Sequence, residues 1–490
     1  MDGKKVTPMK NAEGKSNPII INENENTSNV ILGNRFHKNI IPELKVDNAK
    51  MFFYGKDGKG NEIRIPLSEE LLSRHLMLIG GIGTGKTNTI NQYVSELRKI
   101  ITTDDIAIIF DTKGDFYNLF YRPGDVVISN DETACDSLKR PNYWNIFKEI
   151  SNDEHIMESI NEISYSLFKE ACERTNQPFF PNAARDIFSA ILWDFVKNRP
   201  VNERTNRFLS KFLFKDASIK ELKELLNRNE EFRALISYID NETSNQTQGV
   251  IAELQRVTRN YFQSNFNMHG TLGISDLTRQ KGGRFIFIEY DLNIGTMLTP
   301  IYSLMFDIAI KQAIGRDRSK GNVYFITDEF RLLPNLVHID DAVNFGRSLG
   351  VKFLISIQNI NQIYENYGEQ RARSIMSGFL TTISFRVTDE PTRDFIKSSF
   401  GKNRKKDSFG NIVSTRGLIE ETREGFVVED WDITNLDRGH AIIGMPGIEP
   451  FLFDFKEFKE QEYKATLKSK IDEVEKSTSK LKKLRFTYDW

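Results

Sequence analysis

The sequence is poor in the residues that build cross-links and metal centres. Its 490 residues include only 2 cysteines and 6 histidines. Cys135 and Cys172 form no C-x-x-C pair, and the histidines never fall at metal-ligand spacing. The pattern argues against both a disulfide framework and a structural metal site. A reducing compartment, the cytoplasm, is therefore expected.

Long apolar runs and an excess of one charge are also absent. No run approaches the roughly 20 apolar residues that cross a bilayer, and the N-terminus lacks the basic-then-apolar order of a signal peptide. We therefore expect a protein with no transmembrane segment. If the protein acts at the inner face of the membrane, a partner would have to recruit it there. Lys plus Arg number 67 against 68 for Asp plus Glu. A surface for nucleic acid must then be a local patch or a lined channel.

The 39% of hydrophobic residues is enough for a large core, and their spacing predicts its layout. Between about residues 143 and 277 the spacing is helical, as in the segment 183–196. On either side, short apolar runs predict parallel strands covered on both faces. These runs are Leu76–Ile79, Ile106–Phe110, Val126–Ile128, Arg284–Glu289, Val323–Thr327, Lys352–Ile357 and Thr381–Phe385. The pattern predicts an α/β fold with a mostly parallel sheet and an inserted all-α domain.

The most specific motif is G-x-x-x-x-G-K-[ST], placed directly after an apolar strand and before a helical run. Such a loop turns backbone N–H groups inward around phosphate oxygens, and the following helix adds its positive dipole end. Lys86 is expected to reach the β- and γ-phosphates of ATP, and the Thr87 hydroxyl to hold Mg²⁺. The predicted nucleotide-binding residues are Gly80, Gly81, Ile82, Gly83, Thr84, Gly85, Lys86 and Thr87.

A second apolar strand, Val323–Thr327, ends in two adjacent carboxylates. We expect Asp328 to bind Mg²⁺ and Glu329 to orient and deprotonate an attacking water. Because the additional carboxylate serves a water nucleophile, the pair favours hydrolysis over transfer of a phosphoryl group to a small acceptor.

These predictions divide the chain into five parts. Residues 1–50 are polar and predict a flexible arm. Residues 51–150 and 278–455 form the two parts of a nucleotide-binding domain, and residues 151–277 form the inserted all-α domain. Residues 456–490 predict a peripheral helix, because neither Gly nor Pro occurs from 456 to 485 and apolar residues there fall at helical spacing.

Several segments, in order along the chain, resemble a known family. They are FDTKGDF at 110–116, TDEF at 327–330, GRSLG at 346–350, the strand ending in Gln358, NQIYENYG at 361–368 and VVEDWDITNL from 427, which leads to AIIGMPG at 441–447. Together they are similar to the conjugative and type IV secretion coupling proteins (TraD/TrwB/TraG type), within the HerA/FtsK class of DNA-translocating ATPases. The resemblance spans residues 71–455.

The resemblance implies a RecA-like P-loop NTPase core, a homo-hexameric ring and ATP-driven movement of DNA in conjugation or type IV secretion. It also implies that Gln358 senses the γ-phosphate and that Arg347 is a finger reaching the ATP of a neighbouring subunit. A relaxase or secretion-channel proteins are the implied partners. Members usually carry N-terminal membrane helices, and this sequence departs from them in that respect.

Alternatives remain open at this point. The chain could instead be an ATP-gated docking protein that recruits a relaxase or effector through its helical insert, or a HerA-like motor that serves a nuclease in DNA processing or phage defence. The stretch 346–350 also fits the esterase pattern G-x-S-x-G, but its strand follows the serine instead of preceding it. A basic run in a predicted loop between Gly401 and Gly410 either contacts DNA or is merely solvated. Its residues are Lys402, Arg404, Lys405 and Lys406.

Overall fold

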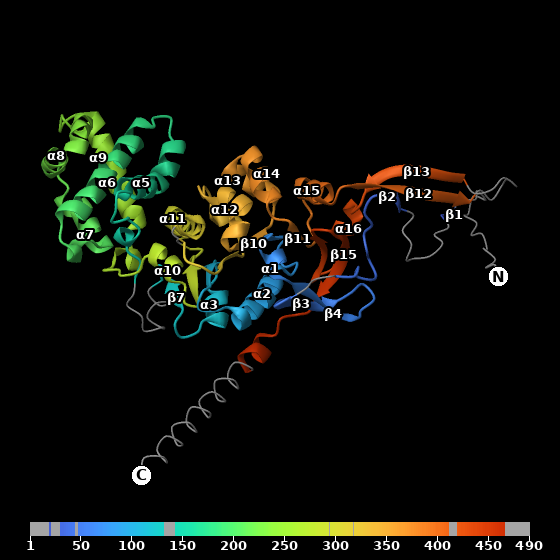
Figure 1. The fold of residues 1–490 in the computed structure, drawn as a ribbon. Helices are drawn as coiled ribbons and strands as arrows, with labels where there is room; N and C mark the ends of the chain where they lie inside the picture. The colour runs from blue at the N-terminus through green and yellow to red at the C-terminus, as the bar shows by residue number, and fades with distance from the viewer. Residues whose placement is uncertain are drawn as a thin grey trace, which may run out of the picture.

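One large sheet runs through the middle of the molecule (Figure 1). The computed structural model describes residues 19–20, 30–44, 48–131, 143–293, 295–316, 318–410 and 419–465. The sheet has 11 strands. In spatial order they are β4 (Glu62–Leu67), β3 (Met51–Lys56), β15 (Ile448–Phe455), β14 (His440–Met445), β11 (Thr381–Ser384), β5 (Leu76–Ile79), β10 (Val351–Ile357), β9 (Val323–Thr327), β6 (Ile106–Asp111), β8 (Arg284–Glu289) and β7 (Val126–Ile128).

The part of this sheet from β11 to β7 is parallel throughout, and it contains every strand predicted from an apolar run. Its strands are buried on both faces, which is why they read as continuous apolar runs. In β5, for example, Leu76 and Leu78 join the core on one face, whereas Met77 and Ile79 join the core on the other. The strands β14, β15, β3 and β4 extend this sheet in antiparallel order.

Helices cover both faces of the sheet (Figure 1). On one face lie α1 (Glu69–Leu72), α2 (Lys86–Ile100) and α3 (Asp115–Phe120). On the other lie α11 (Gly295–Ile314), α12 (Ile339–Phe345), α13 (Ile360–Tyr367) and α14 (Glu369–Ser377). The helices α15 (Glu390–Phe400) and α16 (Asp430–Thr434) lie toward the antiparallel end of the sheet. The arrangement is the predicted α/β class.

The inserted all-α domain is also confirmed. Among the described residues between β7 and β8, all regular elements are helical. The α-helices are α5 (Ile156–Glu173), α6 (Phe179–Asn198), α7 (Asn206–Lys211), α8 (Ile219–Arg228), α9 (Asn245–Tyr261) and α10 (Ile274–Gln280). Shorter turns of helix are η1 (Ile146–Lys148), η2 (Val201–Glu203), η3 (Phe212–Asp216), η4 (Glu230–Tyr238) and η5 (Ser264–Asn267).

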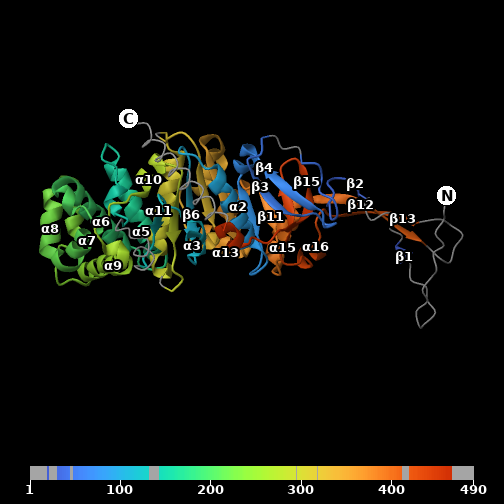
Figure 2. The same ribbon diagram turned by 90° about the horizontal axis from the view of Figure 1, so that it is seen from below.

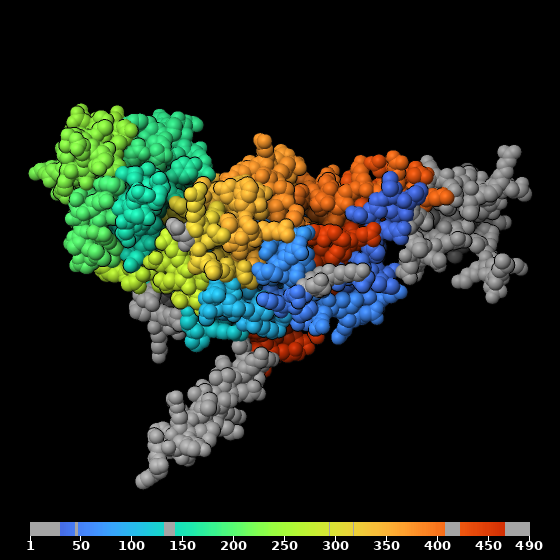
Figure 3. Space-filling model, viewed as in Figure 1, coloured from blue at the N-terminus to red at the C-terminus, as the bar shows by residue number. Residues whose placement is uncertain are grey.

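This helical block forms one end of the molecule and contacts the core through α11, against which α5 and α9 pack (Figures 2 and 3). The two ends of the block lie side by side. Trp144 and Leu272 form an isolated β-bridge, and the buried Glu149 carboxylate accepts hydrogen bonds from the Trp144 indole (2.8 Å) and the Ile274 N–H (2.6 Å). The block is therefore inserted without disturbing the pairing of β7 with β8.

The prediction of a loop for the basic run was wrong. The run lies on β12 (Lys402–Gly410), which pairs with β13 (Ile419–Phe426) in an antiparallel ribbon at the end opposite the helical block (Figure 1). Charges on the two strands pair across the ribbon, as between Lys402 Nζ and Glu424 Oε1 at 2.9 Å. Part of the predicted N-terminal arm adds to the same sheet, through β2 (Val30–Leu32) and β1 (Ile19–Ile20).

At the other end of the chain, residues 460–465 are helical. Tyr463 packs on Phe120 with ring centroids 5.2 Å apart. Residues 456–459 of the predicted helix are not helical, and residues 466–490 lie outside the described residues. None of the helices in the described ranges combines the length and apolar character that crossing a bilayer requires.

A buried ion pair fixes α2 to the edge of the sheet. The Arg98 guanidinium pairs with the Asp125 carboxylate and also donates to the Phe120 carbonyl at 2.8 Å. Its Cζ lies 3.3 Å from the centre of the Phe285 ring. The Phe285 N–H donates to Asp125 Oδ1 at 2.8 Å. One carboxylate therefore joins α2 to the first residues of β8.

Replacing Arg98 should destabilise the fold strongly, because the change leaves the Asp125 carboxylate buried without its cation. We expect Arg98→Met to lower the free energy of unfolding by about 3–5 kcal/mol, measured by urea denaturation. The control is Arg174→Met. Arg174 is 79% exposed and forms an ion pair with Glu170 on the surface of α5, and its loss should cost less than about 1 kcal/mol. Equal effects of the two substitutions would contradict this assignment.

Candidate nucleotide-binding site

The predicted phosphate loop connects the carboxyl end of β5 to the start of α2. Gly85 caps α2 with a φ of 125°, a conformation that side chains rarely adopt. A Cβ on Gly80 would lie 2.6 Å from the Cβ of Phe385. Backbone hydrogen bonds of 2.9 Å anchor the loop on both sides, from the Gly81 N–H to Arg386 and from the Gly439 N–H to Thr84. The glycines are therefore required for the shape of the loop.

The loop presents hydrogen-bond donors to its interior. The Lys86 ammonium donates to the carbonyls of Gly80 (2.5 Å) and Gly81 (2.8 Å). Burial lowers the pKa of Lys86. The backbone N–H groups of residues 83–87 donate to no backbone acceptor in the described ranges. Unpaired N–H groups beside a buried ammonium at a helix start fit the oxygens of a phosphate group.

The strand-end carboxylates lie at the same edge of the sheet as the loop. Both Asp328 carboxylate oxygens lie near Thr87 Oγ1, at 3.3 and 3.4 Å, although the two residues are 241 positions apart. Burial raises the pKa of Asp328, and the Lys86 charge opposes that rise. A hydroxyl and a carboxylate are oxygen ligands of the kind that Mg²⁺ prefers. The two residues predicted to hold the metal are thus brought together, and their chemistry fits that ion.

Glu329 and Gln358 also meet at this edge. The Gln358 side-chain amide donates to Glu329 Oε2. The other carboxylate oxygen, Oε1, is buried and accepts no hydrogen bond in the described structure, although Arg331 Nε lies 3.3 Å away. Burial raises the pKa of Glu329, and the charges of Arg331 and Lys86 oppose that rise. The Glu329 carboxylate thus keeps a lone pair on Oε1 that could take a proton from a water admitted to this buried site.

Arg347 lies far from this group. It belongs to η7 (Gly346–Leu349), at the amino-terminal end of β10, whereas the phosphate loop follows the carboxyl end of the parallel strand β5. Its guanidinium side chain is 53% exposed and lies 3.3 Å from Glu70 Oε1. Arg347 is thus at the edge of the sheet opposite the loop of its own chain.

The basic run is likewise separate from the loop, on the β12–β13 ribbon. Lys402 pairs with Glu424, and Lys405 donates to the Phe426 carbonyl (2.9 Å) and to Glu429 (3.1 Å). Contact of Lys402, Arg404, Lys405 and Lys406 with DNA stays a prediction.

Sequence reasoning missed two neighbours of the predicted residues. Arg331 stands two positions after Glu329, so the sequence held a local signal that a cation would lie beside this carboxylate. Glu70 is 277 positions from Arg347, and nothing in their local sequences indicates that they meet. The η6 turn (Phe330–Leu332), which places Arg331, was also unforeseen.

Comparison with known proteins places this geometry in context. A family model described as the type IV secretion-system coupling protein DNA-binding domain matches residues 62–452. Coupling protein TraD of Escherichia coli (strain K12) is 26% identical over 415 residues, which are 81% of this chain and 54% of TraD. The chain therefore spans about half the length of this curated relative.

Solved structures show the same fold. The plasmid coupling protein TrwB in complex with the non-hydrolysable ATP analogue ADPNP matches with a TM-score of 0.67 and 20% identity, over 88% of this chain and 95% of that one. TrwB in complex with ADP and Mg²⁺ matches with a TM-score of 0.65 and 19% identity, over 84% and 90%. VirB4 of Thermoanaerobacter pseudethanolicus matches with a TM-score of 0.53 and 13% identity, over 86% and 100%.

The loop geometry predicts that nucleotide binding depends on Lys86. Mg²⁺ with ATP at about 100 times its Kd should stabilise the chain by about 2.7 kcal/mol, which a rise in Tm would report. Lys86→Ala should abolish this rise, because the phosphates lose the buried ammonium. The control is Lys59→Ala, at an exposed lysine between β3 and β4, which should keep the full rise. An unchanged rise in the Lys86→Ala chain would show that the nucleotide does not occupy this loop.

Proposed function

The chain belongs to the type IV secretion-system coupling protein family, and from this premise we propose that it is an ATPase that moves DNA. ATP and Mg²⁺ are its expected ligands. The phosphate-loop motif supports this, as does the binding of an ATP analogue, and of ADP with Mg²⁺, by the structural relative TrwB. The observation that carries the proposal is the convergence of Thr87 with Asp328 and of Gln358 with Glu329 at one edge of the sheet.

Each residue of this group has a proposed role. Lys86 and the N–H groups of the loop bind the phosphates, and Thr87 and Asp328 hold the metal. Bound Mg²⁺ would neutralise the charge on the transferred phosphoryl group. Glu329 accepts a proton from the attacking water through its available oxygen. Gln358 fixes the orientation of that carboxylate through the other oxygen, and its second proposed role is to sense the γ-phosphate.

The position of Arg347 supports assembly of several copies. From the opposite edge of the sheet its guanidinium cannot reach the loop of its own chain, and we propose that it reaches the loop of an adjoining copy. A planar guanidinium there would stabilise charge in the transition state. We therefore include a ring of identical subunits in the proposal, with DNA as the moved substrate and a relaxase or secretion-channel protein as a further partner.

DNA-stimulated hydrolysis is the test of this function. Glu329→Gln should lower kcat about a hundredfold to ten-thousandfold, because the water loses its base, while the rise in Tm with Mg²⁺ and ATP persists. The control is Glu457→Gln, at an exposed carboxylate just after β15, which should leave turnover unchanged. An ATPase that responds to neither single-stranded nor double-stranded DNA would overturn the DNA part of the proposal.

Mixing two inactive variants tests whether Arg347 acts between subunits. Lys86→Ala and Arg347→Ala should each lower turnover about a thousandfold. In a one-to-one mixed assembly, about a quarter of the interfaces pair an intact loop with an intact arginine, since a ring uses one repeated interface. Turnover should then return to roughly that fraction of the wild-type rate.

A mixture as inactive as its components, under conditions where light scattering shows that mixed assemblies form, would contradict action in trans. Wild-type turnover by an isolated subunit would contradict it equally. The Lys86→Ala chain mixed with itself is the matched control, and it should stay inactive.

A further inference from the structure

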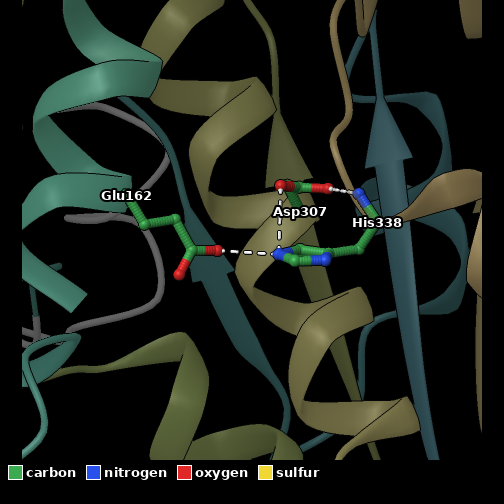
Figure 4. Close-up of side chains that lie close together, drawn as sticks. All are labelled: Glu162, Asp307 and His338. Carbon is green, nitrogen blue, oxygen red and sulfur yellow. Dashed lines mark hydrogen bonds and ion pairs between the residues drawn. The ribbon is translucent and has the colours of Figure 1, made fainter. Parts of the chain in front are cut away.

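A cluster of charged side chains joins the inserted helical block to the core. Glu162 comes from α5, Asp307 comes from α11, and His338 directly precedes α12 (Figure 4). Lys311, also on α11, completes the cluster. His338 Nε2 lies 2.9 Å from Glu162 Oε1 and 4.0 Å from Asp307 Oδ2. The His338 backbone N–H donates to Asp307 Oδ1 at 2.9 Å. Lys311 forms an ion pair with the other oxygen of Glu162.

The charges of this cluster balance when His338 is protonated. Two carboxylates then face one imidazolium and one ammonium. The Asp307 side chain is only 9% exposed, and its Oδ2 lies 4.0 Å from His338 Nε2. A neutral imidazole would leave this carboxylate without a cation, which is costly for a buried charge.

The raised pKa of His338 agrees with this balance, whereas the raised pKa of Asp307 means that this carboxyl is fully ionised only above about pH 6. Burial lowers the pKa of His338, but the hydrogen bond to Glu162 and the charges of Asp307 and Glu162 outweigh it and raise the pKa overall. Burial raises the pKa of Asp307 to about 6. The charged groups facing the cluster are Glu162 and Lys169 from α5, Asp307 and Lys311 from α11, Asp340 from α12 and Arg371 from α14.

A bound metal is the competing use of these residues. One ligand atom each from Glu162, Asp307 and His338 lie within 4.8 Å of one another. However, Glu162 already carries the Lys311 ammonium on its second oxygen, and it contacts the imidazole at hydrogen-bond distance. An additional divalent cation would leave excess positive charge, so the contacts favour a proton on His338.

His338 ends the segment that begins directly after Glu329. Helices α13 and α14 hold this segment on one side. The Tyr367 hydroxyl donates to the Leu333 carbonyl at 2.5 Å, and Arg371 donates to the Leu336 carbonyl at 2.7 Å. On the other side, the His338 imidazole contacts Glu162 of the helical block. The cluster therefore links the block to the segment that follows the proposed catalytic base.

We propose that protonated His338 and Glu162 form a latch, in which both act as positioning residues that hold residues 330–338 against α5. Docking of the helical block and placement of Glu329 then depend on one another. The catalytic consequence rests on the proposed ATPase function, whereas the latch itself does not. A demonstrated coupling between the two ends is the evidence that such a link requires.

The latch should weaken as the pH rises. A group whose pKa is raised in the folded state stabilises fully below its unfolded pKa, about 6.5 for histidine, and this contribution is lost as the pH passes its folded pKa. Asp307 loses its own contribution earlier, between its ordinary pKa of 3.8 and its raised pKa of about 6, so the change above pH 6.5 belongs to His338. The latch is therefore closed at pH 6 and open at high pH.

Hydrogen–deuterium exchange of the full chain, without nucleotide, tests the latch directly. After correction for intrinsic rates, amides of residues 330–338 and of the first turns of α5 should exchange about tenfold faster at pH 8.5 than at pH 6, the equivalent of one hydrogen bond to a charged group. His338→Gln should show the fast rate at both pH values. His338→Lys, which keeps a cation, should show the slow rate at both. His269→Gln is the control, because His269 is exposed on the same block and contacts Thr205 and Phe208, away from α5 and from residues 330–338.

Several outcomes would overturn the latch. One is identical exchange in wild type and His338→Gln at pH 6, and another is an equal effect of His269→Gln. A third is a rise in Tm with Zn²⁺ at pH 8.5 that His338→Gln removes, because the cluster would then be a metal site.

In a second measurement, wild-type ATP turnover should fall as the pH rises over the range in which exchange becomes faster, and His338→Lys should flatten that fall. If no form turns over ATP, the proposed function has failed, and the exchange result still decides the latch.

Discussion

The structure depends on one constraint of parallel sheets, that the carboxyl ends of neighbouring strands lie at the same edge. The adjacent strands β5, β10 and β9 end in the phosphate loop, in Gln358 and in the Asp328–Glu329 pair. The register of these strands therefore brings together residues that are far apart in the chain, such as Thr87 and Asp328, which are 241 positions apart. Burial of these strands on both faces makes the register firm, since a shift would expose apolar side chains.

The same constraint places the phosphate loop and Arg347 at opposite edges of the sheet. Connections into the strands place Arg347 and Glu70 at one edge, and connections out of them build the phosphate loop at the other. Under the proposed function, the guanidinium at the first edge completes the loop of another copy. Assembly and catalysis would then be inseparable, and the contact of Arg347 with Glu70 occupies the guanidinium when no neighbour is present.

The sequence predicted the parts of the fold that depend on local pattern. Buried parallel strands appear as continuous apolar runs, and their predicted bounds agree with β5, β6 and β9 to within one residue. The phosphate loop was predictable because its glycines, Lys86 and Thr87 are contiguous. The basic run was misplaced in a loop because its polar, mostly basic sequence becomes a strand only through pairing with β13, which is a non-local contact.

Contacts between distant segments gave no local signal. Glu162, Asp307 and His338 are ordinary polar residues in their own neighbourhoods, and only the packing of α5 on α11 brings them together. This is also why the spacing of the histidines was uninformative. The roles of Gln358 and Arg347 rest on resemblance, and the structure adds the neighbours, Glu329 and Glu70, that give those roles a physical setting.

The most direct measurement of the central claim is an experimental structure of the assembled protein with Mg²⁺ and a non-hydrolysable ATP analogue. The account predicts the phosphates within the loop of residues 80–87 and the metal between Thr87 and Asp328. It also predicts Glu329 beside the γ-phosphate, together with the guanidinium of Arg347 from an adjoining copy. A nucleotide bound elsewhere, or a γ-phosphate that neither Glu329 nor the arginine of a neighbour approaches, would contradict it.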